Sequence, residues 1–254
     1  MKTDNVDFSV ITVCYNAAST ISETIESVLQ QTDICFEYII MDGCSTDDTV
    51  ELLNNVTDPR VKFISEKDNG LYDAMNKAIS LASGKYIAII NADDIYVDEF
   101  VLSSVKQEFE RSLADIVSGH LYYFDTDFSK KARRYRCSPL SNRAKWGLGW
   151  QPPHPSTYVK KEVYDSIGLY CPSYKISADY EFLLRALFVN KYKHSVIDQD
   201  LVAMRLGGES TAGVKSIYLG NKEVLDAWKR NGKKAPFYLV FIKLFNKLFS
   251  GGLL

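Results

Sequence analysis

Two kinds of hydrophobic pattern alternate along the first half of the chain. Short runs of β-branched and aromatic residues, typical of buried strands, are separated by segments in which apolar residues recur every three or four positions, which is typical of helices. The predicted strands cover residues 8–14, 36–41, 61–64 and 86–90, and the predicted helices begin near Thr20, Ser45 and Leu71. Strands that alternate with helices in this way predict an α/β protein with a mostly parallel sheet flanked by helices.

Local signals mark two of the helix ends. Thr20 and Glu23 have the spacing of a capping box at the start of the first helix. Gly84 follows the third helix at a position typical of a C-terminal stop.

The second half of the chain has a different pattern. Two strand-like segments, 114–124 and 131–136, are joined by an Asp-rich turn and predict a hairpin. The remaining pattern predicts a loop rich in Trp, Gly and Pro over 142–155, a helix over 177–190, a strand over 192–204 and a helix over 216–230. No internal repeat or low-complexity linker separates the two halves, so we expect them to share one core.

The C-terminal segment carries an apolar face next to basic residues. The apolar positions at helical spacing are Phe237, Val240, Phe241, Leu244, Phe245 and Leu248, and the basic residues before them are Lys229, Arg230, Lys233 and Lys234. The segment is too short and too charged to span a bilayer, and it predicts an amphipathic helix that lies in the interface of an anionic membrane. The alternative is a terminal helix that packs on the core or in a dimer, because apolar faces at helical spacing usually mean core.

Composition and charge are those of an ordinary soluble globular protein. The chain has 254 residues, 46% hydrophobic and 24% charged, enough for one large domain or a domain with an appendage. A net charge of −2 does not suggest a nucleic-acid partner. The five cysteines form no C-x-x-C pair, which predicts reduced thiols in a cytosolic protein rather than a disulfide framework or zinc site. The sequence has neither an apolar signal region nor a run of about 20 apolar residues.

Two adjacent carboxylates follow the strand over 86–90 directly, in the segment Asn91–Asp94. Open α/β sheets bind ligands at the carboxyl edge of their strands. Two carboxylates with an asparagine, and no nearby Cys or His, form a hard oxygen site of the kind that suits Mg²⁺ or Mn²⁺ bridging to phosphate. The alternative is a loop in which Asp94 or Asp98 caps the helix that follows.

Polar residues also follow the other three strands. Thr12, Tyr15 and Asn16 lie at the end of the first strand, Asp42 ends the second, and the segment 66–70 follows the third. These loops can hold a base and ribose, with Asp42 accepting from the uracil N3–H or a sugar hydroxyl. Any one of them reads equally well as an ordinary turn, but polar groups at four successive strand ends predict one shared site.

The motifs at these positions resemble glycosyltransferase family 2. The motifs are Val10–Asn16, Asp42–Asp48, Glu66–Asn76, Asn91–Asp94, His154–Thr157, Ser177–Phe182 and Arg205–Gly208. The resemblance covers roughly residues 6–210. Within the family, the chain most resembles bacterial enzymes of O-antigen, capsule and colanic-acid assembly. It implies a GT-A fold, a nucleotide-sugar donor that is usually a UDP-sugar, a divalent metal, and inversion at the anomeric carbon.

This resemblance implies a division of the chain. Residues 1–210 are expected to form the GT-A domain, with a nucleotide-sugar-binding half over 1–112 and an acceptor-side half over 113–210. Residues 211–254 are then expected to form a C-terminal helical extension.

The resemblance also implies roles for residues on the donor side. Thr12, Tyr15 and Asp42 match the nucleoside-binding positions of the family. Asp68 and Asp73 match its nucleotide and donor-sugar region.

Asp93 and Asp94 match the family's D-x-D-like site, here in the form Ala-Asp-Asp. We therefore expect Asp94 to bind Mn²⁺ or Mg²⁺ and Asp93 to contact the ribose or the donor sugar. Arg205 is expected to reach the diphosphate from a late loop, and its alternative is a solvated surface cation.

On the acceptor side, Asp179 matches the family's catalytic base. An inverting transfer needs a carboxylate opposite the leaving UDP to take the proton of the acceptor hydroxyl. Without the resemblance, Asp179 reads as an aspartate that satisfies amides at a helix start. We expect His154 to have a supporting role, and Trp150 to stack on a sugar face or to pack in the core.

The sequence therefore predicts an inverting glycosyltransferase of bacterial surface polysaccharide biosynthesis. Its donor is a UDP-sugar, with UDP-Gal or UDP-Glc favoured, and its acceptor is a lipid-diphosphate-linked saccharide. We expect a cytoplasmic protein, peripheral on the inner face of the cytoplasmic membrane; homo-oligomer formation is left open.

Two other functions fit parts of this pattern. A sugar-phosphate nucleotidyltransferase also uses strand-end carboxylates, but it needs a Gly-rich and basic phosphate loop where this chain has Tyr15–Ser19. A non-catalytic sugar-nucleotide-binding subunit is disfavoured by the presence of Asp179.

Overall fold

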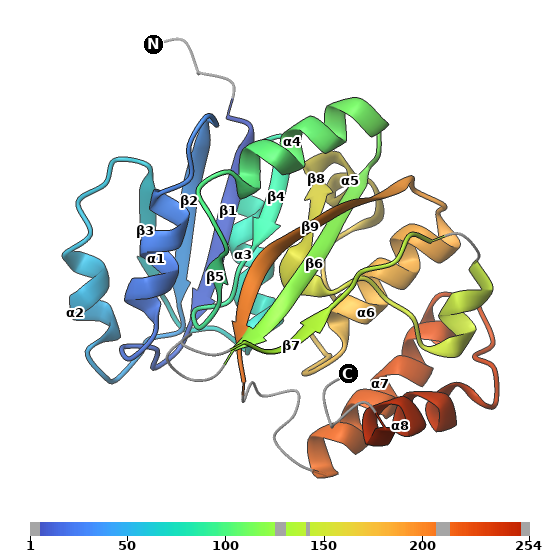
Figure 1. The fold of residues 1–254 in the computed structure, drawn as a ribbon. Coiled ribbons are helices and arrows are strands. Elements are labelled where there is room, and N and C mark those ends of the chain that lie inside the picture. The colour runs from blue at the N-terminus through green and yellow to red at the C-terminus, as the bar shows by residue number, and fades with distance from the viewer. Residues whose placement is uncertain (1–5, 125–130, 141–142, 207–213, 250–254) are drawn as a thin grey trace.

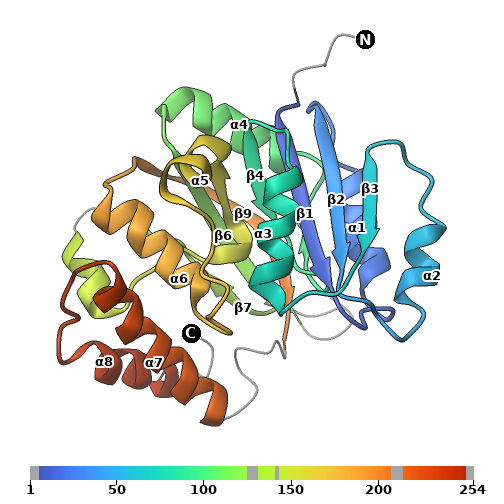
Figure 2. The same cartoon turned by 180° about the vertical axis from the view of Figure 1, so that it is seen from behind.

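The computed structural model describes residues 6–124, 131–140, 143–206 and 214–249. Within these residues, a nine-stranded twisted sheet lies at the centre and helices cover both of its faces (Figures 1 and 2). The strands are β1 (Phe8–Cys14), β2 (Phe36–Asp42), β3 (Val61–Ser65), β4 (Tyr86–Ile89), β5 (Ile95–Tyr96), β6 (Ile116–Phe124), β7 (Lys131–Tyr135), β8 (Thr157–Lys160) and β9 (His194–Arg205). Their order is β3-β2-β1-β4-β8-β6-β9-β5, and β7 also pairs with β6.

Strands β1 to β4 are parallel, as predicted. Every residue of β1 is buried, and its register pairs Phe8 with Phe36 of β2 and with Tyr86 of β4. Burial on both faces explains why β1, β2 and β4 are largely apolar runs instead of alternating patterns, whereas the edge strand β3 is only partly buried. The four predicted strand ranges are confirmed to within one residue at each end.

Successive residues of β1 face opposite layers of helices. The helices are α1 (Ile21–Leu29), α2 (Thr49–Asn54), α3 (Leu71–Leu81), α4 (Val101–Ser112), α5 (Lys161–Ile167), α6 (Ala178–Leu183), α7 (Val214–Arg230) and α8 (Leu239–Phe249). Val10 packs in an apolar cluster with α1 and α4, whereas Ile11 packs in a second cluster with α3, α5, α6 and α7. The two layers are seen from opposite sides in Figures 1 and 2. The predicted mixed α/β architecture is confirmed.

Two predictions about helix starts are wrong. Thr20 precedes α1 but makes no side-chain capping bond, so Thr20 and Glu23 do not form a capping box. Helix α2 begins at Thr49 instead of Ser45, because the Ser45 amide donates to the Asp42 carboxylate at 3.0 Å and forms a turn.

The second half confirms the hairpin and adds two elements. Strands β6 and β7 pair antiparallel with Leu121 opposite Tyr135, and their turn lies outside the described residues. The unpredicted strand β8 lies antiparallel between β4 and β6, so the sheet becomes mixed there. Its four residues are too short for a recognisable pattern, and they run directly into α5, which was not predicted either.

The helix predicted over 177–190 has two parts. Helix α6 ends at Leu183, and a π-helical segment continues over Leu184–Val189. The predicted loop over 142–155 contains a 3₁₀ turn, η1 (Arg143–Leu148), and the shorter turn η2 (His154–Ser156) begins near its end.

The C-terminal helices belong to the same body as the sheet. On α7, Val224, Ala227 and Trp228 are buried in the apolar cluster that includes α3 and α6. On α8, Leu239 is fully buried in that cluster as well. The division of the chain at residue 210 stays a prediction. No helix in the described part of the chain is long and apolar enough to cross a membrane.

Candidate active site

The loops after β1, β2, β3 and β4 meet at one edge of the sheet, since these strands are parallel neighbours. Asn16 links the first two loops. Its amide donates to the Ser45 hydroxyl at 2.7 Å, and its side-chain oxygen accepts from the Thr46 amide at 2.8 Å. These contacts join the loop after β1 to the loop after β2.

Two residues predicted to contact the nucleoside are buried within this edge. Thr12 is fully buried; its hydroxyl lies 2.9 Å from that of Tyr38 and donates to the Ile90 carbonyl at 3.0 Å. Asp42 is also fully buried and accepts from the hydroxyls of Ser45 and Ser65. Both side chains are therefore held by hydrogen bonds within the protein, and their contacts with a nucleoside stay predictions.

Tyr15 and Asp68 lie on either side of Gly43. A Cβ atom at Gly43 would lie 2.6 Å from Asp68 Oδ2 and 3.6 Å from Tyr15 Cδ2, so a larger residue there would displace the Asp68 carboxylate. Tyr15 is 62% exposed, and Asp68 Oδ1 accepts from the Gly70 amide at 2.8 Å. The exposed Tyr15 ring can stack on a base, and the Asp68 carboxylate beside it can accept a hydrogen bond from that base. From the sequence, Gly43 reads only as a turn residue.

Asp73, in the first turn of α3, holds the loop that carries Asp68. Its Oδ2 atom accepts from the Asn69 amide at 2.9 Å and lies 3.7 Å from Lys77 Nζ. The predicted contact between Asp73 and the donor therefore competes with a role in shaping this loop.

Asp93 and Asp94 form a mostly buried carboxylate pair after β4. Asp94 is only 1% exposed and accepts from Asn91 Nδ2 at 2.9 Å. Burial raises the pKa of Asp93 and raises that of Asp94 well above its usual range, and the charge of Asp93 adds to the second shift. A cation beside the pair would offset both effects.

The pair fits a metal that is shared with a ligand. Among the described residues there is no group of three or more His, Cys, Asp or Glu side chains that can hold a metal ion. Mg²⁺ is commonly bound by one or two carboxylates together with substrate phosphates and water. Asp93 and Asp94 are consistent with that arrangement and not with a site built from protein ligands alone.

Arg205, at the end of β9, joins the carboxylate pair. Its positive charge lowers the pKa of both Asp93 and Asp94, and a hydrogen bond with its backbone lowers that of Asp94 further. Its side chain forms an ion pair with Glu23 of α1. The Arg205 side chain is 12% exposed, so it is not a solvated surface cation. The spacing assigned Glu23 to a capping box and therefore missed this partner.

Asp179 lies in the first turn of α6, as predicted. Its Oδ1 atom accepts from the Tyr72 hydroxyl at 3.3 Å and its Oδ2 atom from Gln151 Nε2 at 3.2 Å. The Tyr72 hydroxyl also donates to the Ile176 carbonyl at 2.8 Å, so its single proton is shared between this carbonyl and Asp179. Burial raises the pKa of Tyr72 well above its usual value, which keeps this hydroxyl protonated. Tyr72 and Gln151 were not identified from the sequence.

His154 is close enough to Asp179 to feel its charge. Its Nε2 atom is 3.0 Å from the Tyr170 hydroxyl, burial lowers the pKa of His154, and the charge of Asp179 opposes that shift. Trp150 Nε1 donates to the Ser138 hydroxyl at 3.0 Å. The Trp150 ring also packs edge-on against the Trp146 ring, with 5.4 Å between the ring centres. The contacts of Trp150 favour packing over sugar stacking.

Helix α3 connects the two sides of the site. Asp73 in its first turn holds the loop of Asp68, and the neighbouring Tyr72 contacts Asp179. The structure thus joins the predicted donor loops to the predicted base through adjacent residues.

Comparison with known proteins identifies the family to which this chain is similar. A family model described as "Glycosyl transferase family 2" matches residues 9–178. The chain is 37% identical over 123 residues, 47% of each protein, to the Escherichia coli "UDP-Glc:alpha-D-GlcNAc-diphosphoundecaprenol beta-1,3-glucosyltransferase WfaP".

Two solved structures share the fold. S. aureus TarS 1-349 in complex with UDP-GlcNAc superposes with a TM-score of 0.70 at 16% identity, covering 97% of this chain and 73% of that one. The mannosyltransferase PcManGT from Pyrobaculum calidifontis, in complex with GDP-Man and Mn²⁺, gives 0.67 at 17% identity and covers 97% and 71%. The predicted GT-A fold is confirmed.

Proposed function

The chain belongs to glycosyl transferase family 2 and is a glycosyltransferase, and from this premise we propose that it transfers a hexose from UDP-Gal or UDP-Glc to a lipid-linked glycan. The similarity to WfaP, whose name gives a UDP-Glc donor and a diphosphoundecaprenol acceptor, supports this substrate class. The complex of TarS with UDP-GlcNAc supports a UDP-sugar donor. We place the reaction in bacterial polysaccharide or lipid-linked glycan biosynthesis.

One observation carries the proposal: the first turn of α3 binds both the donor-side loop and the carboxylate of Asp179. Asp73 bonds to Asn69, and Tyr72 bonds to Asp179. A nucleotide bound at the sheet edge would therefore lie on the same framework as a base that can reach an acceptor.

On the donor side, Tyr15 stacks on the base, Asp68 accepts from the nucleoside and Arg205 faces the diphosphate. Asp94 would hold a divalent cation, which when bound would stabilise the charge that develops on the departing UDP, and Asp93 would contact the ribose or the donor sugar. The complex of PcManGT with Mn²⁺ supports a metal of this kind.

On the acceptor side, Asp179 takes the proton of the acceptor hydroxyl as its oxygen attacks the anomeric carbon. The bond from that carbon to the UDP oxygen breaks on the opposite face, which inverts the configuration. Tyr72 and Gln151 orient the carboxylate through its two oxygens. His154, which is hydrogen-bonded to Tyr170, is assigned a supporting role on this side of the site.

The C-terminal segment is proposed to attach the enzyme to the cytoplasmic face of an anionic membrane. Lys233 and Lys234 are exposed, and so are Phe237 in the turn before α8 (89%) and Phe241 on α8 (73%). Such a surface suits anionic headgroups and the acyl boundary beneath them. The side chains of Phe245 and Leu248, also assigned to this face from the sequence, lie outside the described residues.

A thermal-shift screen with Mn²⁺ and UDP-Gal, UDP-Glc, UDP-GlcNAc, UDP-GalNAc or GDP-Man tests the donor. A bound donor raises the melting temperature because it stabilises the folded protein. At a donor concentration one hundred times its Kd, the free energy of unfolding rises by about 2.7 kcal/mol. We expect UDP-Gal or UDP-Glc to give the largest shift, and hexose transfer to a lipid-diphosphate saccharide to follow that donor.

The rival functions give different results in the same set of assays. A larger shift with GDP-Man would contradict the UDP donor. Release of diphosphate from a nucleoside triphosphate and a sugar phosphate would favour a nucleotidyltransferase. Donor binding with neither hydrolysis nor transfer would favour a non-catalytic subunit.

A further inference from the structure

The segment that leads into Asp179 is held by a side chain from helix α7. The Glu223 carboxylate accepts from the backbone amides of Lys175 at 2.8 Å, Ile176 at 3.0 Å and Ser177 at 2.8 Å. Glu223 is only 7% exposed. These three amides precede α6 and have no helical partner, so the buried carboxylate satisfies donors that would otherwise lack an acceptor.

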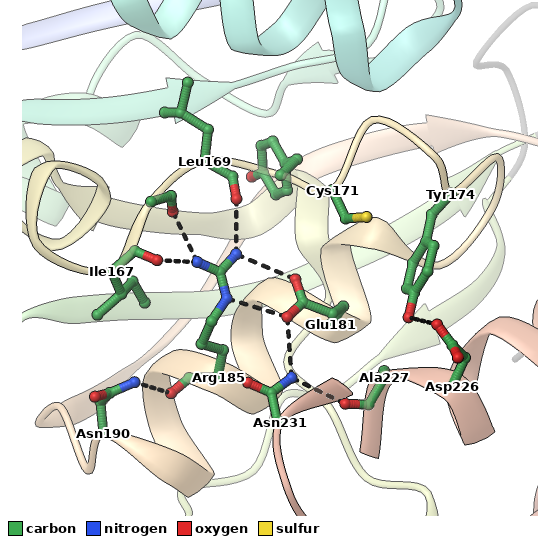
Figure 3. Close-up of polar contacts among 12 residues, drawn as sticks. Ile167, Leu169, Cys171, Tyr174, Glu181, Arg185, Asn190, Asp226, Ala227 and Asn231 are labelled. Atoms are coloured by element: carbon green, nitrogen blue, oxygen red, sulfur yellow. Dashed lines mark hydrogen bonds and ion pairs between the residues drawn. The ribbon is translucent and has the colours of Figure 1, made fainter. Parts of the chain in front are cut away.

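Further contacts extend this attachment along the segment. They run from the Tyr174 hydroxyl to Asp226 (2.7 Å), from the Ser177 hydroxyl to the Gly220 carbonyl (3.2 Å), from Trp228 Nε1 to the Tyr180 hydroxyl (2.9 Å) and from Asn231 Nδ2 to Glu181 (2.9 Å). Figure 3 shows the Tyr174 and Asn231 contacts from α7 and the residue after it. Residues on both sides of Asp179 are thus bonded to this helix or to Asn231 just beyond it.

The Arg185 guanidinium fixes the other end of α6. It donates to Glu181 and to the carbonyls of Ile167, the last residue of α5, and of Gly168 and Leu169, which follow it (Figure 3). Glu181 therefore receives bonds from both Arg185 and Asn231. The result is a rigid frame around a short helix of six residues.

Asp179 itself contacts other elements. Its carboxylate meets Tyr72 of α3 and Gln151, not α7. Ile176 connects the two sets of contacts, because its amide donates to Glu223 and its carbonyl accepts from Tyr72 at 2.8 Å. A shift of Ile176 would move the hydroxyl that orients Asp179.

We propose that Glu223 is a positioning residue for glycosyl transfer, acting on Asp179 through residues 175–177. The inference rests on the proposed function, because it requires Asp179 to be the base. Helix α7 lies outside the residues that the family model matches, so this role belongs to the part of the chain beyond them. The C-terminal extension then serves catalysis as well as attachment.

The carboxylate is matched to its three donors. A glutamine at 223 offers one oxygen and turns an NH₂ group toward a backbone N–H, so at least one amide of the segment loses its acceptor. The segment would then relax while the donor loops at the ends of β1 to β4 stay in place. Misplacement of a reacting group by about 1 Å can cost about 100-fold in rate.

The test compares Glu223→Gln with Asp226→Asn in steady-state transfer to a soluble acceptor. Asp226→Asn is the matched control, since it makes the same change on the same helix and its amide oxygen can still accept from Tyr174. We expect Glu223→Gln to lower kcat by about 10- to 100-fold. The donor KM and the affinity for UDP with Mn²⁺ should stay unchanged, and Asp226→Asn should behave as wild type.

Gly220→Ala provides a second variant in case Glu223→Gln does not fold. An added Cβ would lie 3.3 Å from Ile176 Cγ2 and 3.5 Å from Ser177 Oγ, so it presses on the same segment. Alanine favours the helix over glycine, which offsets part of that cost. A folded Gly220→Ala protein with several-fold lower kcat supports the proposal, and wild-type kcat in either folded variant overturns it.

Asp179→Asn separates this proposal from the function on which it rests. We expect that variant to lose about 10²- to 10⁴-fold in transfer, and Glu223→Gln to cause no further loss when the two are combined, because both act through one group. Wild-type turnover by Asp179→Asn would overturn both the base assignment and the positioning role. An inactive Asp179→Asn beside a fully active Glu223→Gln would overturn the positioning role alone, as would an additional loss in the double variant.

Discussion

The Asp94 carboxylate is buried beside Asp93, and burial raises the pKa of both groups. An asparagine at 94 can keep the hydrogen bond from Asn91 and removes a buried charge, so Asp94→Asn should fold normally. An amide is a poorer ligand than a carboxylate for Mn²⁺ or Mg²⁺. We expect metal-dependent UDP binding to weaken by about tenfold or more. Mutation of residues that merely support a metal's ligands typically costs at least about that much affinity, and Asp94 is proposed to be a ligand itself.

Calorimetry of UDP binding with and without Mn²⁺ measures this loss. Asp98→Asn is the matched control, because Asp98 follows in the same segment, is exposed, and has a carboxylate that accepts from the Phe100 amide, a bond that an asparagine oxygen can keep. Metal dependence that is equal in Asp94→Asn and wild type would remove Asp94 from the metal site.

At the residue scale, the sequence identified the carboxylates but not the groups that orient them. Asp94 and Asp179 follow a strand and begin a helix, and such positions can be read locally. Tyr72 lies 107 positions before Asp179 and Glu223 lies 46 after Ser177, and on their helices both read as ordinary core or surface residues. Contacts at that separation depend on the complete fold.

At the scale of elements, burial decided which predictions succeeded. Strands β1, β2 and β4 lie between two layers of helices, so their apolar runs identify them without tertiary information. Strand β8 has only four residues and is placed by its antiparallel neighbours β4 and β6. The helix predicted over 177–190 has the right periodicity, but periodicity alone does not reveal a change from α- to π-helical hydrogen bonding at Leu184.

Gly84 illustrates a different limit and leads to a prediction about packing between elements. It is not a helix stop, because α3 ends at Leu81 and Ala82 is already extended. Instead, a Cβ at Gly84 would lie 2.4 Å from the Ser9 amide nitrogen and 2.5 Å from the Phe8 carbonyl carbon of β1. We expect Gly84→Ala to lower the free energy of unfolding by about 1–3 kcal/mol through overpacking, as measured by urea denaturation.

Gly232→Ala separates this steric effect from backbone strain. Gly232 has a φ of +66° and no atom within 4 Å of an added Cβ, so its substitution costs backbone strain alone. If Gly84→Ala is no more destabilising than Gly232→Ala, the close approach of the α3–β4 turn to β1 is not a constraint on the fold.

At the scale of the whole molecule, the C-terminal segment has both a buried residue and exposed aromatic residues, so the two alternatives that the sequence presented do not exclude each other. Leu239 is fully buried, and the Lys243 ammonium lies 4.7 Å from the centre of the Tyr180 ring. Phe237 and Phe241 nevertheless remain exposed. One face of α8 thus packs on the protein while another is available to a membrane.

This arrangement determines how membrane binding should be tested. Deleting residues 233–254 would remove Leu239 from the core and confuse loss of binding with loss of folding. We expect the double substitution Phe237→Ser and Phe241→Ser to abolish co-sedimentation with phosphatidylglycerol vesicles while leaving the melting temperature and turnover of a soluble acceptor unchanged. Wild-type binding should weaken with salt, because each basic residue near an anionic surface contributes about 1 kcal/mol.

The matched control for the membrane test is Tyr218→Ser. Tyr218 is 71% exposed on α7, so it is an aromatic residue of similar exposure outside the Phe237–Phe241 surface. Its substitution should leave vesicle binding intact. Equal binding by the double variant and wild type, or binding that is insensitive to salt, would show that the exposed phenylalanines and Lys233–Lys234 do not attach the enzyme to a membrane. Loss of binding only when the protein also unfolds would assign α8 a packing role alone.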